Sequence, residues 1–463
     1  MSATRRAFLT AAGAACGLVA SGGCRTCSGW EGRGLLRRAG AGERLNVALI
    51  GVGGRGAAHV SAVRRAGENV VALCDVDEEL LAAGRALLGE QADGARLYKD
   101  FRVMLEAEKA IDAVFVATPD HMHGLQAAWA IDRGCHVYLE TPLVRTLGEW
   151  RTLQARARAK RVLVQAGSQG SALASFRRAA AAVAAGVIGS VAEAHVWTSR
   201  PVWPQGLAHP EGNDPVPPSL DWDLWLGGAP QRPFRTRAYH RFNWRGWCDF
   251  GTGALGDGGM HLMNLPFRAL GWGPAVAVEA EETSMRFPES YCTSSRVRFE
   301  FAAEGRRPGA QLFWYDGGMK PPTDRLPAAV AAAALPDTGC LLVGDKGVWM
   351  TNDDWGKQHL LALGAEPRAT DADRHEALAA LALNLPEAKG QQQEFLDAVR
   401  SGDRPYSEMS RVAALTESLL AGCVAQRVSG RLAWNSRKGC FSNSAEAQAL
   451  VAPAFREGWA YPA

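Results

Sequence analysis

The sequence predicts an α/β protein with an N-terminal doubly wound parallel sheet, followed by an α+β domain with a large open, mainly antiparallel sheet. Near residues 45–66, an apolar strand runs into a glycine-rich turn and then into a helical pattern. Short apolar strands alternate with helical stretches up to about residue 165, as in a parallel sheet. Beyond that point, residues 191–197 and 294–301 alternate apolar and polar side chains, which is typical of antiparallel strands.

The turn after the first strand has the spacing G-x-G-x-x-G and comprises residues Gly51, Gly53, Gly54, Arg55 and Gly56. In a dinucleotide-binding fold, the first glycine allows a tight turn, the second lets the backbone approach a pyrophosphate, and the third lets the helix pack on the strand. The helix N-terminus then offers amide donors to the phosphates. A glycine-rich turn of purely structural importance is the alternative interpretation.

The second strand, residues 70–74, ends at Asp75, which lies 19 residues after Gly56. An acid at this offset can accept hydrogen bonds from both hydroxyls of an adenosine ribose. Its charge would repel a 2′-phosphate, so the sequence predicts NAD as the cofactor and makes NADP the less favoured choice.

Two further strands, residues 111–117 and 136–139, end in polar segments. Ligands of such sheets lie outside the carboxyl ends of the strands. We therefore expect the segments 118–123 and 140–142 to line the nicotinamide end of the cleft. The cofactor contacts predicted in these segments are Thr118, Pro119, His123 and Glu140, and Gln169 is a further one beyond them.

The chain has the composition of an ordinary globular protein, and its 463 residues are enough for two or three domains. Its formal net charge is +3. So small a charge offers no argument for nucleic acid or an acidic membrane surface as a partner. Of the ten cysteines, Cys24 and Cys27 form a C-x-x-C pair with no second ligand pair nearby, and the seven that follow show no metal-ligand spacing, so no metal site is predicted.

The first 24 residues read as a twin-arginine export signal, since Arg5 and Arg6 precede a mild apolar stretch. A disordered tail with two chance arginines is the alternative. Cys24 follows a short glycine-rich run and is a candidate for lipid attachment. We expect a linker over residues 25–43, a nucleotide-binding domain over 44–165 and a substrate and oligomerisation domain over 166–463. Export to the periplasm would make the twin-arginine machinery a partner.

Six of the fifteen tryptophans lie between residues 197 and 247, interleaved with arginines. An aromatic face beside hydrogen-bonding forks suits a sugar or polyol, although the same rings could simply pack long loops. The predicted substrate contacts are Arg200, Trp203, Gln205, Tyr239, Arg245 and Trp247.

Asp257 and His261 stand four residues apart, so on a helix they would share one face. The acid could orient the imidazole, and His261 could then act as the general base for a substrate hydroxyl. A pair with this spacing is common, however, and by itself carries no assignment.

The chain resembles the Gfo/Idh/MocA oxidoreductases, which include glucose–fructose oxidoreductase and inositol dehydrogenase, and especially their twin-arginine-exported bacterial subgroup. The resemblance rests on RRAFL, GVGGRG, ATPDHMH, VYLETPL, WTSRPVWPQG, DWDLWLG and NWRGWCDFGTGALGDGGMH. It implies hydride transfer at a sugar carbon near a lysine of an E-K-P motif and a D-x-x-x-H pair, which Asp257 and His261 match. It also implies a Rossmann domain, and an open C-terminal sheet often used in oligomer contacts.

The E-K-P motif reads Glu140-Thr141-Pro142 in this chain, so Thr141 stands where the family has its catalytic lysine. Threonine cannot serve as a base. We therefore expect an exported NAD-dependent oxidoreductase acting on a carbohydrate or polyol, with His261 as base and with tightly held cofactor. The alternatives are an NAD-dependent glycosidase or lyase that oxidises its sugar transiently, and a catalytically weakened sugar-binding protein.

Overall fold

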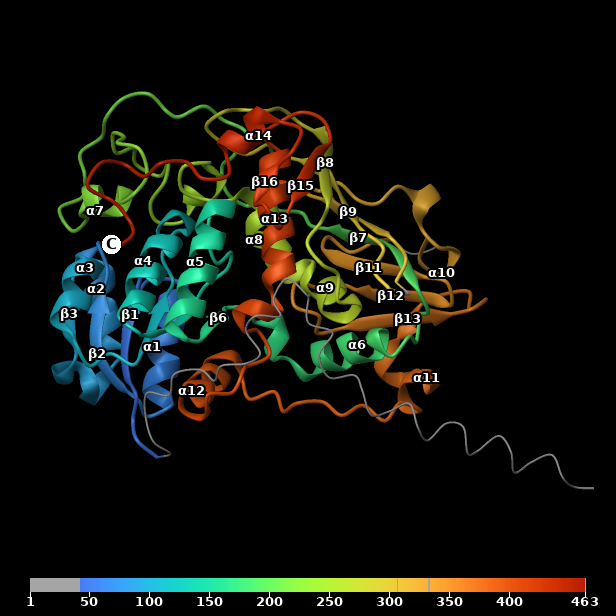
Figure 1. Ribbon diagram of the computed structural model, residues 1–463, viewed down its shortest axis with the longest axis horizontal. Coiled ribbons are helices and arrows are strands. Elements are labelled where there is room, and N and C mark those ends of the chain that lie inside the picture. Colours follow the sequence, from blue (N-terminus) through green and yellow to red (C-terminus); the bar gives the residue numbers. More distant parts are fainter. Residues whose placement is uncertain (1–41, 306, 332–333, 463) are drawn as a thin grey trace, which may run out of the picture.

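The computed structural model describes residues 42–462 except 306 and 332–333. The predicted signal and the candidate lipid-attachment residue Cys24 lie outside the described residues. Two sheets organise the chain, one on either side of helices that run between them (Figure 1).

The first sheet has six parallel strands in the order β3-β2-β1-β4-β5-β6. Its strands are β1 (Asn46–Ile50), β2 (Asn69–Cys74), β3 (Arg96–Tyr98), β4 (Ala113–Val116), β5 (His136–Leu139) and β6 (Val164–Ala166). The connecting helices are α1 (Arg55–Arg65), α2 (Glu78–Ala86), η2 (Gly89–Gly94), α3 (Phe101–Ala107), α4 (Asp120–Asp132) and α5 (Leu147–Lys160). Strands β1 and β4 are buried almost throughout, as expected of a sheet covered on both faces. This arrangement confirms the predicted Rossmann fold.

The second sheet has ten strands in the order β14-β13-β12-β11-β7-β10-β9-β8-β15-β16. Only β7 and β10 pair in parallel, and the other neighbours are antiparallel. The strands are β7 (Val191–Trp197), β8 (Ala277–Thr283), β9 (Ser295–Phe301), β10 (Ala310–Tyr315), β11 (Gly339–Gly344), β12 (Gly347–Thr351), β13 (His359–Leu363), β14 (Thr370–Asp371), β15 (Leu432–Asn435) and β16 (Cys440–Phe441). The predicted open and mainly antiparallel sheet is therefore confirmed.

The remaining helices lie between the sheets or along their edges. They are η3 (Gly170–Ala172), α6 (Ala174–Ala184), α7 (Trp222–Leu226), η4 (Asn243–Gly246), α8 (Gly253–Leu262), α9 (Asn264–Leu270), η5 (Thr323–Arg325), α10 (Ala328–Ala331), η6 (Ala372–Arg374), α11 (Glu376–Ala379), α12 (Gln391–Ser401), η7 (Met409–Arg411), α13 (Ala413–Ala425) and α14 (Ala445–Ala449).

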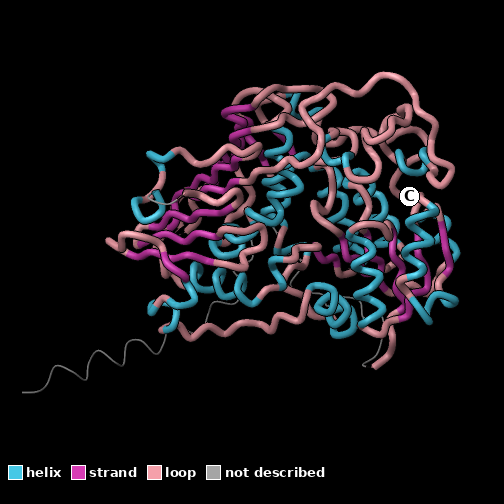
Figure 2. Tube along the Cα trace, turned by 180° about the vertical axis from the view of Figure 1, so that it is seen from behind, coloured by secondary structure: helices cyan, strands magenta, loops and turns pink. Residues whose placement is uncertain are grey.

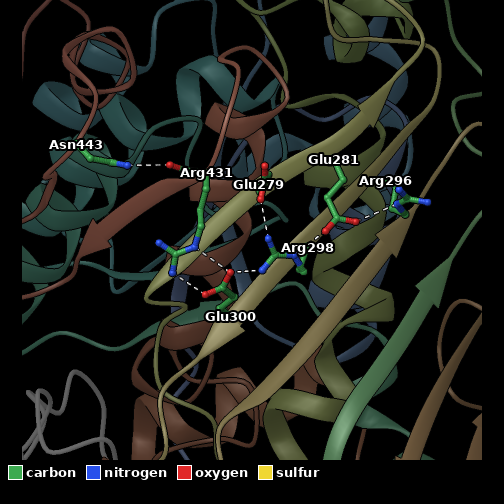
Figure 3. A network of polar contacts seen from close by, with 7 residues as sticks. All are labelled: Glu279, Glu281, Arg296, Arg298, Glu300, Arg431 and Asn443. Carbon is green, nitrogen blue, oxygen red and sulfur yellow. Dashed lines mark hydrogen bonds and ion pairs between the residues drawn. The ribbon is translucent and has the colours of Figure 1, made fainter. Parts of the chain in front are cut away.

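Strand β9 shows how the large sheet divides its two faces. Val297, Phe299 and Phe301 are buried, and α13 approaches so closely that a Cβ on Gly422 would lie 2.6 Å from the Phe299 ring. The alternate residues carry charges, so the opposite face bears a network of ion pairs around Arg298 (Figure 3). Apolar packing on one face and paired charges on the other explain the alternating pattern of residues 294–301.

Two later segments return to the Rossmann domain. Gln391, the first residue of α12, accepts a hydrogen bond from the Tyr138 hydroxyl of β5 at 2.6 Å. Near the C-terminus, Trp459 lies under the guanidinium of Arg102, and the carbonyl of Ala460 accepts from the Trp129 indole. The strands of the parallel sheet end at residue 166. Helix α12 and the C-terminal segment come later in the chain but pack on the first domain.

The predicted long ordered loops between β7 and α8 contain only the short helices α7 and η4. They cross from one sheet to the other as irregular chain (Figure 2). Asp77 of the Rossmann domain forms a β-bridge with Leu220, whereas Trp247 bridges Ser290 of the second domain. This segment thus connects the two domains along one side of the molecule.

Candidate functional site

The turn after β1 can be formed only by glycine at its key positions. Gly51 has φ +78°, and a Cβ there would lie 2.8 Å from the carbonyl oxygen of Ala117. A Cβ on Gly56 would lie 1.9 Å from the Gly51 oxygen, and one on Gly53 would meet Leu80 at 2.8 Å. The first and third glycines therefore allow the close strand–helix packing expected of a dinucleotide fold.

Helix α1 begins immediately after this turn with an open N-terminus. Its N-cap residue is Gly54, with φ 49°, and no side chain caps the first amides. Uncapped amides at a helix start attract anions, because they are unsatisfied donors at the positive end of the helix dipole. Arg55 is exposed at the first helical position and adds a positive charge there. This turn fits the pyrophosphate of a dinucleotide.

Asp75 follows β2 beside the turn. Its carboxylate accepts from the backbone amides of Val52, at 2.9 Å, and Asp77, at 3.1 Å. Burial raises the pKa of Asp75, although these backbone hydrogen bonds oppose the shift. A carboxylate has about four acceptor positions, so capacity remains for ribose hydroxyls.

The segments expected at the nicotinamide end lie at the carboxyl edge of β4 and β5. Helix α4 begins at Asp120, directly after Pro119, so it takes in most of the segment 118–123 that was expected to line the cleft. The ring of His123 consequently turns inward, with Nδ1 2.8 Å from the carbonyl of Pro142 and Nε2 2.8 Å from that of Thr118. Its placement differs from the expectation that it lines the cofactor cleft, because both ring nitrogens contact backbone.

The other expected cofactor residues have distinct surroundings. Thr118 donates its hydroxyl to Gln126 at 2.6 Å. Glu140 contacts the buried His59 ring at 2.8 Å, and although burial opposes ionisation, that hydrogen bond and charge hold the pKa of Glu140 below its usual range. Gln169 is half-buried at the start of η3. Their contacts with a cofactor stay predictions.

Asp257 and His261 lie on α8, as the sequence predicted, and the helix brings His261 close to Glu140. Burial lowers the pKa of His261, with the charges of Asp257 and Glu140 opposing that shift, so the imidazole is neutral at pH 7. Its Nδ1 and the hydroxyl of Thr141 are both buried without a hydrogen-bond partner in the described part of the chain. Buried polar atoms without partners in the protein are positioned to receive them from a ligand.

The carboxylate of Asp257 contacts two arginines. Oδ1 is 3.1 Å from Nε of Arg245, and Oδ2 is 3.5 Å from Nε of Arg200. No hydrogen bond joins Asp257 to His261 among the residues the structure covers. The expected orienting contact is therefore not formed in this structure, and the acid acts on the imidazole only through its charge.

Asp354 is a part of this site that the sequence did not reveal. Its two oxygens lie 3.1 and 2.7 Å from Nη1 and Nη2 of Arg200. It comes from the loop between β12 and β13, 154 residues along the chain from its partner. No motif or local spacing pointed to it.

Asp120 is a buried acid of this site to which the sequence assigned no role of its own. It accepts from the hydroxyl of Thr252, the N-cap residue of α8, at 2.7 Å. Burial raises the pKa of Asp120 to about 8, with the nearby Asp257 adding to the shift and Arg245 opposing it. This acid links the first turn of α4 to the helix that carries His261.

The six predicted substrate residues differ in what they contact. Tyr239 and Trp247 are 1 and 2 % exposed and belong to an aromatic cluster with Trp222, Trp225 and Phe250. By contrast, Arg200 and Arg245 flank Asp257. Their forks are engaged by protein groups, and Arg245 also lies over the rings of Trp203, Phe242 and Trp244. Gln205 holds the Trp203 indole at 3.0 Å and donates to the carbonyl of Cys292. Substrate contact stays a prediction for all six.

The described residues contain no group of three or more side chains that could hold a metal ion. The seven cysteines among them are free thiols. No helix within the described ranges is both long and apolar enough to traverse a bilayer.

Together, the parallel sheet and the glycine turn at the start of α1 define a Rossmann-type, nucleotide-binding protein. A family model described as "Oxidoreductase family, NAD-binding Rossmann fold" matches residues 45–168. A second one, described as "Oxidoreductase family, C-terminal alpha/beta domain", matches residues 190–304. The chain therefore belongs to the Gfo/Idh/MocA oxidoreductase family, and its first domain binds NAD.

Individual relatives match over limited stretches. Inositol 2-dehydrogenase 1 of Saccharopolyspora erythraea is 37% identical over 126 residues, which is 27% of this chain and 36% of that protein. Glycosyl hydrolase family 109 protein 2 of Akkermansia muciniphila is 32% identical over 124 residues, or 26% of each chain. The chain thus matches only about a third of the length of these relatives, or less.

A solved structure extends the likeness in fold. An inositol dehydrogenase homolog from Azotobacter vinelandii, complexed with NADH and myo-inositol, aligns with a TM-score of 0.56 at 19% identity. The alignment covers 86% of this chain and all of that one. At this identity, the comparison shows a common fold.

Proposed function

We propose that this chain is an exported NAD-dependent oxidoreductase that moves a hydride between a carbon of a carbohydrate or polyol and a tightly held nicotinamide. The observation that carries the proposal is the neutral imidazole of His261, with an unpaired buried Nδ1, beside Glu140 at the carboxyl edge of the nucleotide-binding sheet. Inositol dehydrogenases among its relatives, and myo-inositol in one structure of the same fold, support a polyol substrate.

NAD would supply the hydride acceptor, and its pyrophosphate would lie at the turn between β1 and α1. The residues of this chain would handle the proton. His261 accepts the proton of the substrate hydroxyl, because a neutral imidazole has a free lone pair at neutral pH. The nearby charges of Asp257 and Glu140 stabilise the imidazolium that forms. The hydroxyl of Thr141 donates a hydrogen bond to the substrate or accepts one from it, but takes no proton.

Export is supported by the pair Arg5-Arg6 before an apolar stretch, and lipid attachment by Cys24. Because free NAD is expected to be scarce outside the cytoplasm, the cofactor would be inserted before export and recycled within one turnover.

A homo-oligomer formed through the large C-terminal sheet is part of the proposal. Light scattering of the purified protein measures its mass directly.

A redox glycosidase is the second candidate. Its specific support is the similarity to a glycosyl hydrolase family 109 protein. Such an enzyme oxidises the sugar, eliminates the aglycone and then reduces the product. Release of an aglycone with no net change in nicotinamide absorbance would distinguish it from a simple dehydrogenase.

The deciding experiment is to purify the mature protein produced with its own signal, denature it and identify any released nicotinamide by mass spectrometry. Stoichiometric NAD or NADH is the expected result. A protein that contains none and also fails to bind added NAD would refute the proposed function and leave a sugar-binding role as the better interpretation.

A further inference from the structure

Four charges of alternating sign form a chain beside His261: Asp354, Arg200, Asp257 and Arg245. They come from four separate segments: the β12–β13 loop, the residues after β7, helix α8 and the helix η4. Two arginines and two carboxylates give the chain no net charge. All four side chains are between 22 and 30 % exposed, so they are accessible from the site.

The guanidinium fork of Arg200 is closed by Asp354. Both Nη atoms contact the carboxylate, at 3.1 and 2.7 Å, and Nε faces Asp257. This two-point contact has the geometry in which an arginine fork recognises a substrate carboxylate. Asp354 therefore occupies the position that an acidic substrate would need.

The loop that carries Asp354 is firmly held. The neighbouring Asp353 accepts from the backbone amides of Trp355, Lys357 and Gln358, at 2.8, 2.9 and 3.0 Å. The loop also packs against the segment after β6, where a Cβ on Gly170 would lie 2.6 Å from the Trp355 carbonyl oxygen. Because the loop is fixed at both places, Asp354 is pre-positioned on Arg200.

The remaining polar groups suit hydroxyls. Arg245 donates a hydrogen bond from Nε to Asp257 and another from Nη1 to the Phe242 carbonyl, the latter at 3.1 Å. Its Nη2 has no hydrogen-bond partner among the described residues. The Phe242 ring beside it is 48 % exposed, which offers an apolar surface to a sugar C–H face. The charges of Asp257, Glu140 and Asp354 raise the pKa of His261, and the charge of Arg200 lowers it, so the imidazole lies within the field of this chain of charges.

We propose that Asp354 sets the substrate class of this site: by occupying the fork of Arg200, it makes the site select an uncharged polyhydroxylated ring and reject the corresponding uronate. The inference rests on the proposed function, since it assumes that the substrate binds beside His261.

The test uses matched neutral and anionic sugars, D-glucose with D-glucuronate and D-galactose with D-galacturonate, on the nicotinamide-loaded protein. Two readouts are taken: the second-order rate constant for reduction of the bound NAD in a single turnover, and binding of glucuronate by calorimetry. Wild type should favour the neutral sugar of each pair. Asp354→Asn keeps the shape but removes the negative charge and one of the two acceptors that hold the Arg200 fork, so a uronate can compete for the guanidinium. The variant should shift the ratio toward the uronate and tighten glucuronate binding by about tenfold or more, as expected of a charge-assisted two-point contact.

Two further variants serve as controls. Asp93→Asn removes the same charge at a side chain that is 98 % exposed, and it should leave the ratio unchanged. Asp354→Asn combined with Arg200→Gln should return the preference to that of wild type, because the freed fork is then gone. Bound nicotinamide and the melting temperature establish that each variant is folded.

A wild type that favours uronates would overturn the inference. So would an Asp354→Asn variant that binds glucuronate no more tightly than Asp93→Asn. If no sugar is oxidised by any variant, the oxidoreductase function fails, but glucuronate binding to Asp354→Asn still decides whether the Arg200 fork is the blocked anion site.

Discussion

Replacing Asp120 with asparagine is expected to flatten the dependence of stability on pH. The carboxyl is 3 % exposed, accepts from the hydroxyl of Thr252, and has a pKa raised by burial to about 8. Asparagine keeps an acceptor for that hydroxyl but cannot ionise. The perturbation therefore removes one buried titration and little else.

The sign and size follow from linkage between folding and protonation. In the unfolded chain, an aspartate titrates near pH 4, so below that pH both states are protonated and the group contributes no pH dependence. Between about pH 4 and 8, the unfolded chain has lost a proton that the folded protein keeps, which destabilises the fold by about 1.4 kcal/mol per pH unit. Above the folded pKa of about 8, the loss levels off at ~5 kcal/mol.

The assay is urea denaturation followed by tryptophan fluorescence at pH 5, 7 and 9, with the exposed Asp93→Asn as control. Asp120→Asn should lose less unfolding free energy than wild type between pH 5 and 9, by several kcal/mol. Its extra amide hydrogens can cost about 1–3 kcal/mol where unpaired, but that cost does not change with pH. Equal slopes for wild type and Asp120→Asn would refute the idea that this carboxyl is protonated when folded.

Three other changes address the nucleotide turn and the chemistry. Gly56→Ala should abolish NAD binding in a fluorescence titration, because its Cβ would lie 1.9 Å from the Gly51 oxygen, whereas Gly94→Ala, where a Cβ meets open space, should bind normally. The acid limb of the pH profile of kcat/KM should have its midpoint below 6.5, since protonation of His261, whose pKa burial lowers, removes the base; His261→Gln should lose both that limb and about 10²–10⁴-fold in rate. Thr141→Lys should raise turnover. A variant that stays inert on a broad sugar panel while binding NAD would favour the sugar-binding alternative.

The nucleotide turn and several strands and helices were predictable because the residues that determine them are close in the sequence. The turn after β1 needs glycine at positions set by backbone contacts a few residues away, and β7 was expected at the residues where it occurs, 191–197. Periodicity within a segment is likewise enough to indicate helices such as α12 and α13. It could not show that α12 returns to pack on β5, since nothing local encodes which surface a helix will cover.

The start of α4 shows how one local error changes the interpretation of a site. The segment 118–123 was expected to be a loop along the cofactor, but the helix begins at Asp120. Its first turn buries Asp120 and His123 against backbone and against Thr252. The polar character of the motif was therefore a sign of internal hydrogen bonding as much as of ligand contact, and residue types alone do not separate the two.

The pair Asp257 and His261 illustrates the limit of spacing as evidence. A separation of four residues places both side chains on one face of α8, but it does not decide what each one contacts. Arg200 and Arg245 reach Asp257 from outside α8 and take up its oxygens, because two guanidinium groups are stronger partners than a neutral imidazole. Nδ1 of His261 is then left without a hydrogen-bond partner among the described residues, so the tautomer of the ring is not set by the acid. It follows that the substrate itself must complete the hydrogen bonding of His261. This is why we expect the charge of the substrate, which is governed by Asp354 and Arg200, to matter as much to this site as the missing lysine at position 141.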